Sequence, residues 1–76
     1  MVRSFTGLSV ACTRLRRVTG WSQVRASDRC SVSLETWRTW ETTVDKPVRT
    51  HAEFVVRLRQ LLQKHTPENV PVVNMV

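Results

Sequence analysis

The stretch that decides the fold is LRRVTGWSQVRASDRCSVSLETWRTWETTVDKP, residues 15–47. Its pattern predicts two short helices, at about 23–30 and 34–42, separated by only a few residues. Ser22 and Ser33 stand just before these helices, where a serine oxygen accepts a backbone hydrogen bond from the first turn. The stretch therefore predicts two short helices joined by a tight corner.

Apolar residues at helical spacing predict one further helix on each side of this stretch. The first, at about 7–18, ends before a glycine and has an apolar stripe of Leu8, Ala11, Cys12, Leu15 and Val18. The other begins at Thr50 and Glu53, which have the spacing of a capping box, and continues to about residue 64. Its stripe consists of Phe54, Val55, Leu58, Leu61 and Leu62. Residues 43–49 are expected to form a loop, because Pro47 blocks a helix.

A chain of 76 residues is expected to form one domain. We predict an all-α fold of four or five short helices over residues 1–66, followed by an extended tail at 67–76. The tail contains two prolines and is rich in valine, so it is too apolar for an idle linker. It is predicted to serve as a dimerisation arm, and the alternative is a disordered terminus.

The charge balance favours an anionic partner. The chain has 12 Lys and Arg against 6 Asp and Glu, a net charge of +6, and a pI near 11.1. Nucleic acid, a membrane surface and an acidic protein all fit this balance. No apolar run approaches the ~20 residues that a membrane span needs. Membrane insertion is therefore not expected.

The residues that carry chemistry elsewhere are sparse here. Cys12 and Cys30 have no neighbours at metal-ligand spacing, so we expect two reduced, buried thiols in a cytoplasmic protein. His51 and His65 also lack partners at ligand spacing. No nucleophile–base pair or phosphate-binding loop is visible. The sequence predicts no enzyme activity, no metal and no cofactor.

The two-helix stretch resembles the phage-repressor/Cro family, also called the XRE-type helix-turn-helix family. The matching positions are Leu15-Arg16, Gly20, Ser22-Gln23, Val32-Ser33, Thr36-Trp37, Trp40-Glu41 and Pro47. The family usually has glycine where this chain has Ser31 and Thr43, and Leu-Ala where it has Ala26-Ser27. The resemblance implies a regulator that binds double-stranded DNA sequence-specifically, as a homodimeric repressor on a near-palindromic operator.

The resemblance also implies which residues touch DNA. The predicted base-reading residues lie on the segment 34–42 and are Leu34, Glu35, Arg38 and Thr39. In the major groove, Leu34 suits a thymine methyl, Glu35 a cytosine amino group and Arg38 a guanine or a phosphate. The predicted phosphate-binding residues are Gln23, Ser33, Thr42, Lys46 and Arg49. For each of these the alternative is an ordinary exposed polar residue.

Two further expectations concern the interior. The family often pairs the positions of Arg16 and Glu41 in a partly buried salt bridge, and the alternative is two surface charges. Trp37 and Trp40, three residues apart, are expected in the core rather than stacked on bases.

Two other functions remain open at this point. The chain is alternatively an antitoxin or phage accessory protein that uses the same fold mainly to bind another protein, through its apolar tail. It is otherwise a protein–protein module that does not bind DNA.

Overall fold

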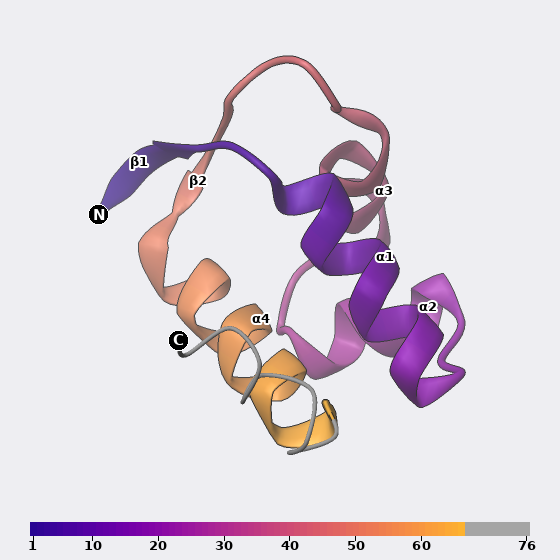
Figure 1. Cartoon of the computed structure of the whole chain (residues 1–76). Coiled ribbons are helices and arrows are strands. Elements are labelled where there is room, and N and C mark those ends of the chain that lie inside the picture. The colour runs from indigo at the N-terminus through magenta and orange to yellow at the C-terminus, as the bar shows by residue number, and fades with distance from the viewer. Residues whose placement is uncertain (67–76) are drawn as a thin grey trace, which may run out of the picture.

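The structure is a computed structural model of the chain, and it describes residues 1–66. The fold is mostly helical, with one small antiparallel sheet (Figure 1). The elements in chain order are β1 Val2–Phe5, α1 Leu8–Thr19, α2 Gln23–Arg29, α3 Leu34–Thr42, β2 Val48–His51 and α4 Ala52–His65. The prediction of a helical chain is confirmed, with four helices in the described part, but the all-α class is wrong because of the two strands. The predicted tail and dimerisation arm at 67–76 lie outside the described residues.

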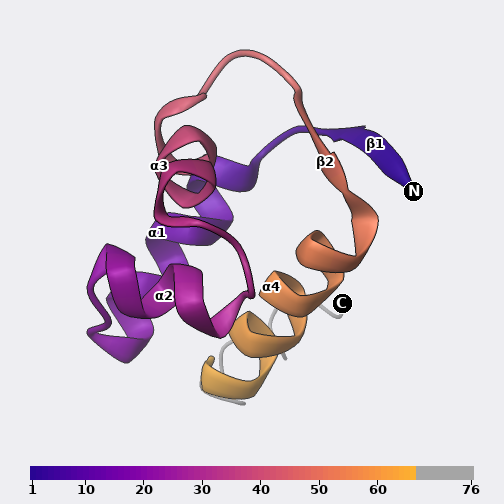
Figure 2. The ribbon, with the colours of Figure 1, turned by 180° about the vertical axis from the view of Figure 1, so that it is seen from behind.

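Helix α1 lies at the centre and packs against both α3 and α4, while α2 packs against α3 and the end of α1 (Figures 1 and 2). The core between them is made of fully or almost fully buried apolar side chains from every helix and one from β2. These are Leu8, Cys12, Leu15, Ala26, Cys30, Trp37, Trp40, Val48, Val55 and Leu58. Both tryptophans of α3 are therefore core residues, as predicted.

Val18 does not lie in this core, although it was expected on the α1 stripe. Its side chain is exposed to solvent. Leu8, Cys12 and Leu15 define the centre of the buried face. At 100° per residue, Val18 lies about 90° around the helix from that centre. The spacing of three residues from Leu15 placed it at the edge of the stripe rather than on it.

The helix ends follow the local signals in the sequence. The Ser22 hydroxyl accepts from the Arg25 backbone N–H at 3.2 Å, and the Ser33 hydroxyl accepts from the Thr36 N–H at 3.1 Å. Gly20 ends α1 in the left-handed conformation, with φ 76°. Both predicted serine caps are confirmed, and they fix where α2 and α3 begin.

The two strands form a ribbon that joins the N-terminus to the segment just before α4. Strand β1 pairs antiparallel with β2, with Arg3 opposite Thr50 and Ser4 opposite Arg49. The predicted capping box at Thr50 and Glu53 is therefore wrong. Strand β2 continues through His51, which is the N-cap of α4, so the helix starts at Ala52, one residue later than a Thr50 cap would set. The Ala52 N–H donates to the Met1 carbonyl at 2.9 Å.

Candidate nucleic-acid interface

Helix α3 presents one face to the core and the other to solvent. Trp37 and Trp40 are buried on its inner face. The outer face carries exposed side chains, and Leu34 at the start of the helix is partly exposed. The exposed residues of this face are Glu35, Arg38, Thr39 and Thr42. The structure thus brings the four predicted base-reading residues together on the outer side of one helix.

The hydroxyl groups of this face are bonded to the helix itself. Thr39 donates to the Glu35 carbonyl at 3.0 Å, and Thr42 donates to the Arg38 carbonyl at 2.8 Å. Each hydroxyl oxygen keeps lone pairs that an outside donor can use. Ser33 is more heavily engaged, because its hydroxyl caps α3 and also donates to the Thr36 hydroxyl at 2.9 Å.

Behind the outer face, one carboxylate ties three helices together. Glu41 on α3 pairs with Arg16 on α1, with Arg16 Nη1 3.2 Å from Glu41 Oε2. The Trp37 indole N–H donates to Oε2 at 2.8 Å, and the Gln23 amide of α2 donates to Oε1 at 2.8 Å. The predicted ion pair is therefore present. It is one part of a larger network that links α1, α2 and α3.

This network sets the ionisation of Glu41. Burial alone raises the pKa of its carboxyl. The hydrogen bonds from Gln23, Trp37 and Arg16, together with the charge of Arg16, lower the pKa by more, so the net pKa lies below the usual value for glutamate. Glu41 is consequently a stable anion at neutral pH, and its negative charge is matched locally by Arg16.

Gln23 lies between Glu41 and the outer face. Its amide nitrogen donates to Glu41, while its amide oxygen accepts from Arg38 Nε at 3.3 Å. The sequence predicted a phosphate contact for this side chain, and the structure places it between the Glu41 carboxylate and the Arg38 guanidinium. The partners Trp37 and Gln23 of Glu41 were missed, although Trp37 and Glu41 are four residues apart and so neighbours on one helix face.

The remaining predicted phosphate-binding residues are not all in one place. Lys46 is exposed in the loop that follows α3. Arg49 is exposed on β2, opposite Ser4 in the ribbon. Figures 1 and 2 show the loop arching away from α3 before it reaches β2. Arg49 therefore belongs to the ribbon, whereas Gln23, Ser33 and Thr42 belong to α2 and α3 or their caps.

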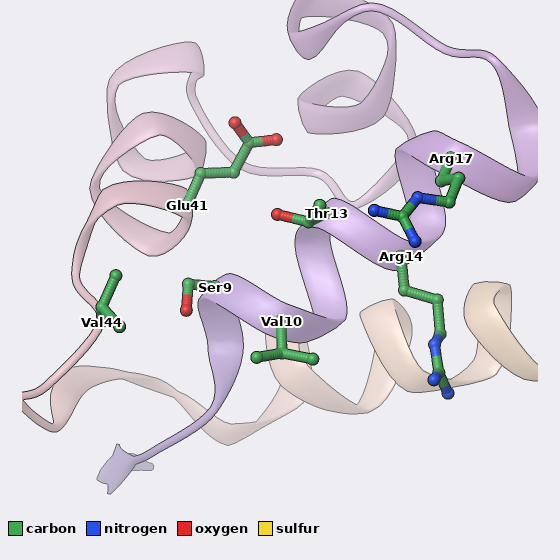
Figure 3. Close-up of a pocket in the computed structure, with 7 residues that line it drawn as sticks. All are labelled: Ser9, Val10, Thr13, Arg14, Arg17, Glu41 and Val44. Atoms are coloured by element: carbon green, nitrogen blue, oxygen red, sulfur yellow. The ribbon is translucent and has the colours of Figure 1, made fainter.

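A surface hollow of about 330 Å³ lies between α1 and the end of α3 (Figure 3). Its lining residues are Ser9, Val10, Thr13, Arg14, Arg17, Glu41 and Val44. In Figure 3 the Ser9 and Thr13 hydroxyls lie on the side facing α3, while Arg14 points away from them.

Nowhere in residues 1–66 do three His, Cys, Asp or Glu side chains gather as a metal site would require.

The two thiols are part of the core. Cys12 and Cys30 are fully buried and free. Burial raises the pKa of Cys30 to about 11. Burial also raises the pKa of Cys12, with smaller contributions from the neighbouring Cys30 and Glu41. Both groups are therefore neutral thiols at physiological pH, which makes them poor nucleophiles and metal ligands.

Comparisons with known protein families, with curated proteins and with solved structures gave no match to this chain. Across the described residues, no helix has the length and apolar character needed to cross a membrane.

Proposed function

We propose that the chain is a helix-turn-helix protein that binds duplex DNA sequence-specifically, with α3 as the helix that enters the major groove. The carrying observation is the contrast between the two sides of α3. Its inner side is anchored by buried Trp37 and Trp40 and by the shared carboxylate of Glu41. Its outer side is a polar, exposed surface that presents hydrogen-bonding groups at helical spacing. A rigid helix with a free polar face is what major-groove recognition needs.

The connection between α2 and α3 supports the same proposal. Only residues 30–33 separate the two helices, and Ser31 turns the chain with φ 61°. Serine caps begin both helices, so neither helix can shift along the chain without losing a hydrogen bond. Two short helices held at a fixed corner are typical of helix-turn-helix proteins.

The charge of the chain supports a phosphate-rich partner. The net charge is +6. Two of the cations, Arg38 on α3 and Lys46 in the loop beyond it, are exposed near the proposed interface. Phosphate contacts release counterions, so binding should weaken steeply with salt. If a complex makes ~6–10 phosphate contacts, its affinity should fall ~10³–10⁵-fold between ~50 and ~200 mM salt.

Repression by a homodimer on a near-palindromic operator completes the proposal. Two copies would place their α3 helices in successive major grooves, ~34–36 Å apart. The proposed joint is the segment 69–76, which lies outside the described residues.

Selection of duplexes from a random pool tests this function. The full chain should enrich a two-fold symmetric sequence, and fluorescence anisotropy should then show binding that falls with salt. Arg59→Ala provides a matched control, because Arg59 is an exposed cation on α4, away from the proposed interface. Arg38→Ala should weaken binding far more than Arg59→Ala. Absence of any enriched sequence, together with binding that is flat in salt, would contradict the proposal.

A further inference from the structure

A chain of hydrogen bonds runs from the carboxylate of Glu41 to the outer face of α3. Glu41 Oε1 accepts from Gln23 Nε2 at 2.8 Å, and Gln23 Oε1 accepts from Arg38 Nε at 3.3 Å. The Glu41 side chain is only 12% exposed, whereas Arg38 is exposed on the outer face of α3. The relay formed by Glu41, Gln23 and Arg38 thus connects the fixed interior to one exposed guanidinium.

The direction of the central amide is determined by its neighbours. A carboxylate only accepts hydrogen bonds, and a guanidinium only donates them. Gln23 must therefore turn its nitrogen to Glu41 and its oxygen to Arg38. The opposite orientation would place acceptor against acceptor at one end and donor against donor at the other. The relay consequently has one stable arrangement.

This arrangement leaves a defined part of Arg38 free. Gln23 occupies Nε, so the terminal Nη1 and Nη2 groups remain as a planar fork. Neither terminal nitrogen donates to another group in the described part of the chain. A fork of two parallel N–H donors matches the O6 and N7 acceptors of guanine in the major groove. Holding Nε reduces the freedom of the side chain and orients that fork.

We propose that Arg38 reads a guanine with its terminal fork, and that Gln23 is a positioning residue for Arg38 rather than a phosphate ligand. This inference rests on the proposed DNA-binding function and narrows it to one contact. A terminal fork matches two phosphate oxygens as well as the edge of a guanine. The position of Arg38 decides between them, because it lies with Glu35 and Thr39 on the exposed face of α3, the face that the proposed function places against the base edges.

Arg38→Lys tests the contact, since lysine keeps the charge but lacks both Nε and the fork. The probe is the duplex enriched from the random pool, together with its variants changed at one base pair at a time. Arg38→Lys should abolish a preference for G·C at one position in each half-site, by roughly 5–150-fold. Because the charge is kept, the salt dependence of binding should not change. Arg59→Lys is the matched control and should preserve every preference.

Gln23→Met tests the positioning role with a side chain of similar size. It should reduce the preference at that same base pair by less than Arg38→Lys does. In the double variant it should have no further effect, because Gln23 acts only through Arg38. Gln60→Met makes the same change at an exposed site on α4 and should alter nothing. Thermal melting establishes that each variant is folded at the assay temperature.

The results separate the inference from the function on which it rests. Uniform weakening by Arg38→Lys across all duplexes would identify a phosphate contact and overturn the guanine assignment, while DNA binding itself stood. Equal effects of Gln23→Met with and without Arg38 would overturn the positioning role. A wild-type chain that enriches no sequence would overturn both the inference and the proposed function.

Discussion

Replacing Glu41 by alanine measures what the shared carboxylate contributes to the fold. The substitution removes the acceptor of the Arg16, Gln23 and Trp37 side chains. Trp37 is 0% exposed, so its indole N–H loses its partner without access to water, at a cost of ~1–3 kcal/mol. Arg16 and Gln23 can be rehydrated, and each adds only ~0.2–1 kcal/mol. We therefore expect Glu41→Ala to lower the free energy of unfolding by about 2–4 kcal/mol.

Arg16→Ala should be milder, because it leaves the Trp37 bond to Glu41 intact. Arg16 is 36% exposed on its side chain, so its ion pair is partly screened. Its loss should cost ~0.5–1.5 kcal/mol, including the bond from Arg16 Nε to the Trp21 carbonyl. The double variant should cost less than the sum of the two. Asp45→Ala, in an exposed loop, is the control and should stay within ~0.5 kcal/mol of wild type.

Urea unfolding followed by far-ultraviolet circular dichroism gives these free energies without depending on the tryptophans. The pH dependence provides a second test. Because folding lowers the pKa of Glu41, its contribution is complete above the unfolded pKa of ~4.3 and is lost as the pH falls through the folded pKa. The stability gap between wild type and Glu41→Ala should therefore narrow in acid. If Glu41→Ala costs no more than Arg16→Ala at pH 7, the assignment of most of the cost to the buried indole is refuted.

Three further outcomes follow from particular residues. Ser31→Gly should raise the free energy of unfolding by up to ~1 kcal/mol in the same urea assay, because a left-handed serine is strained; a lower value would mean that this strain is absent. Cys12 and Cys30 should resist a thiol-specific reagent at pH 8 in the native protein and react once urea unfolds it; fast native labelling would contradict their burial. Glu35→Ala should relax discrimination at one base position by ~1–3 kcal/mol, whereas Lys46→Ala should weaken all duplexes alike; uniform effects of both would count against α3 as the reading helix.

The helices were predictable because their signals are local. The bounds of α3 agree with those expected from Ser33 and the spacing of Trp37 and Trp40, all within ten residues of sequence. Each cap acts on a backbone group three residues away, so no distant part of the chain is needed to recognise it. The outer face of α3 follows from the same periodicity, since the residues opposite the two tryptophans must face away from the core.

The ribbon was not predictable, because its pairing is long-range. Each strand has four residues, and those of β1 show no buried–exposed alternation. Only the approach of Arg3 to Thr50, 47 positions apart in sequence, makes either segment a strand. The same pairing overturned the capping-box prediction, because the strand continues one residue past Thr50 and the N-cap of α4 falls on His51. The local sequence is compatible with Thr50 either as a helix cap or as a strand residue, and pairing with β1 selects the strand.

The two oxygens of Glu41 serve different ends, and Glu41→Gln separates them. Oε2 accepts from the buried indole of Trp37, whereas Oε1 accepts from Gln23, which holds Arg38. An amide has one acceptor oxygen. It should accept from the buried indole N–H of Trp37, because leaving that buried donor without a partner costs more than leaving the Gln23 amide without one. The new amide nitrogen would then face Gln23, whose own amide must turn its oxygen inward to accept. Its nitrogen would meet Arg38, donor against donor, and the guanidinium would be released.

Glu41→Gln should therefore keep more stability than Glu41→Ala, yet lose base preference as Gln23→Met does. The comparison separates two causes of a lost base preference: release of Arg38, and loss of folding. If loss of preference merely followed loss of stability, Glu41→Ala would always be the worse binder, and Asp45→Ala the unaffected one. Anisotropy titrations at a temperature where all three variants are folded distinguish the two cases. Retention of the full G·C preference by Glu41→Gln would show that Arg38 does not depend on the orientation of the Gln23 amide, and the relay would have no part in recognition.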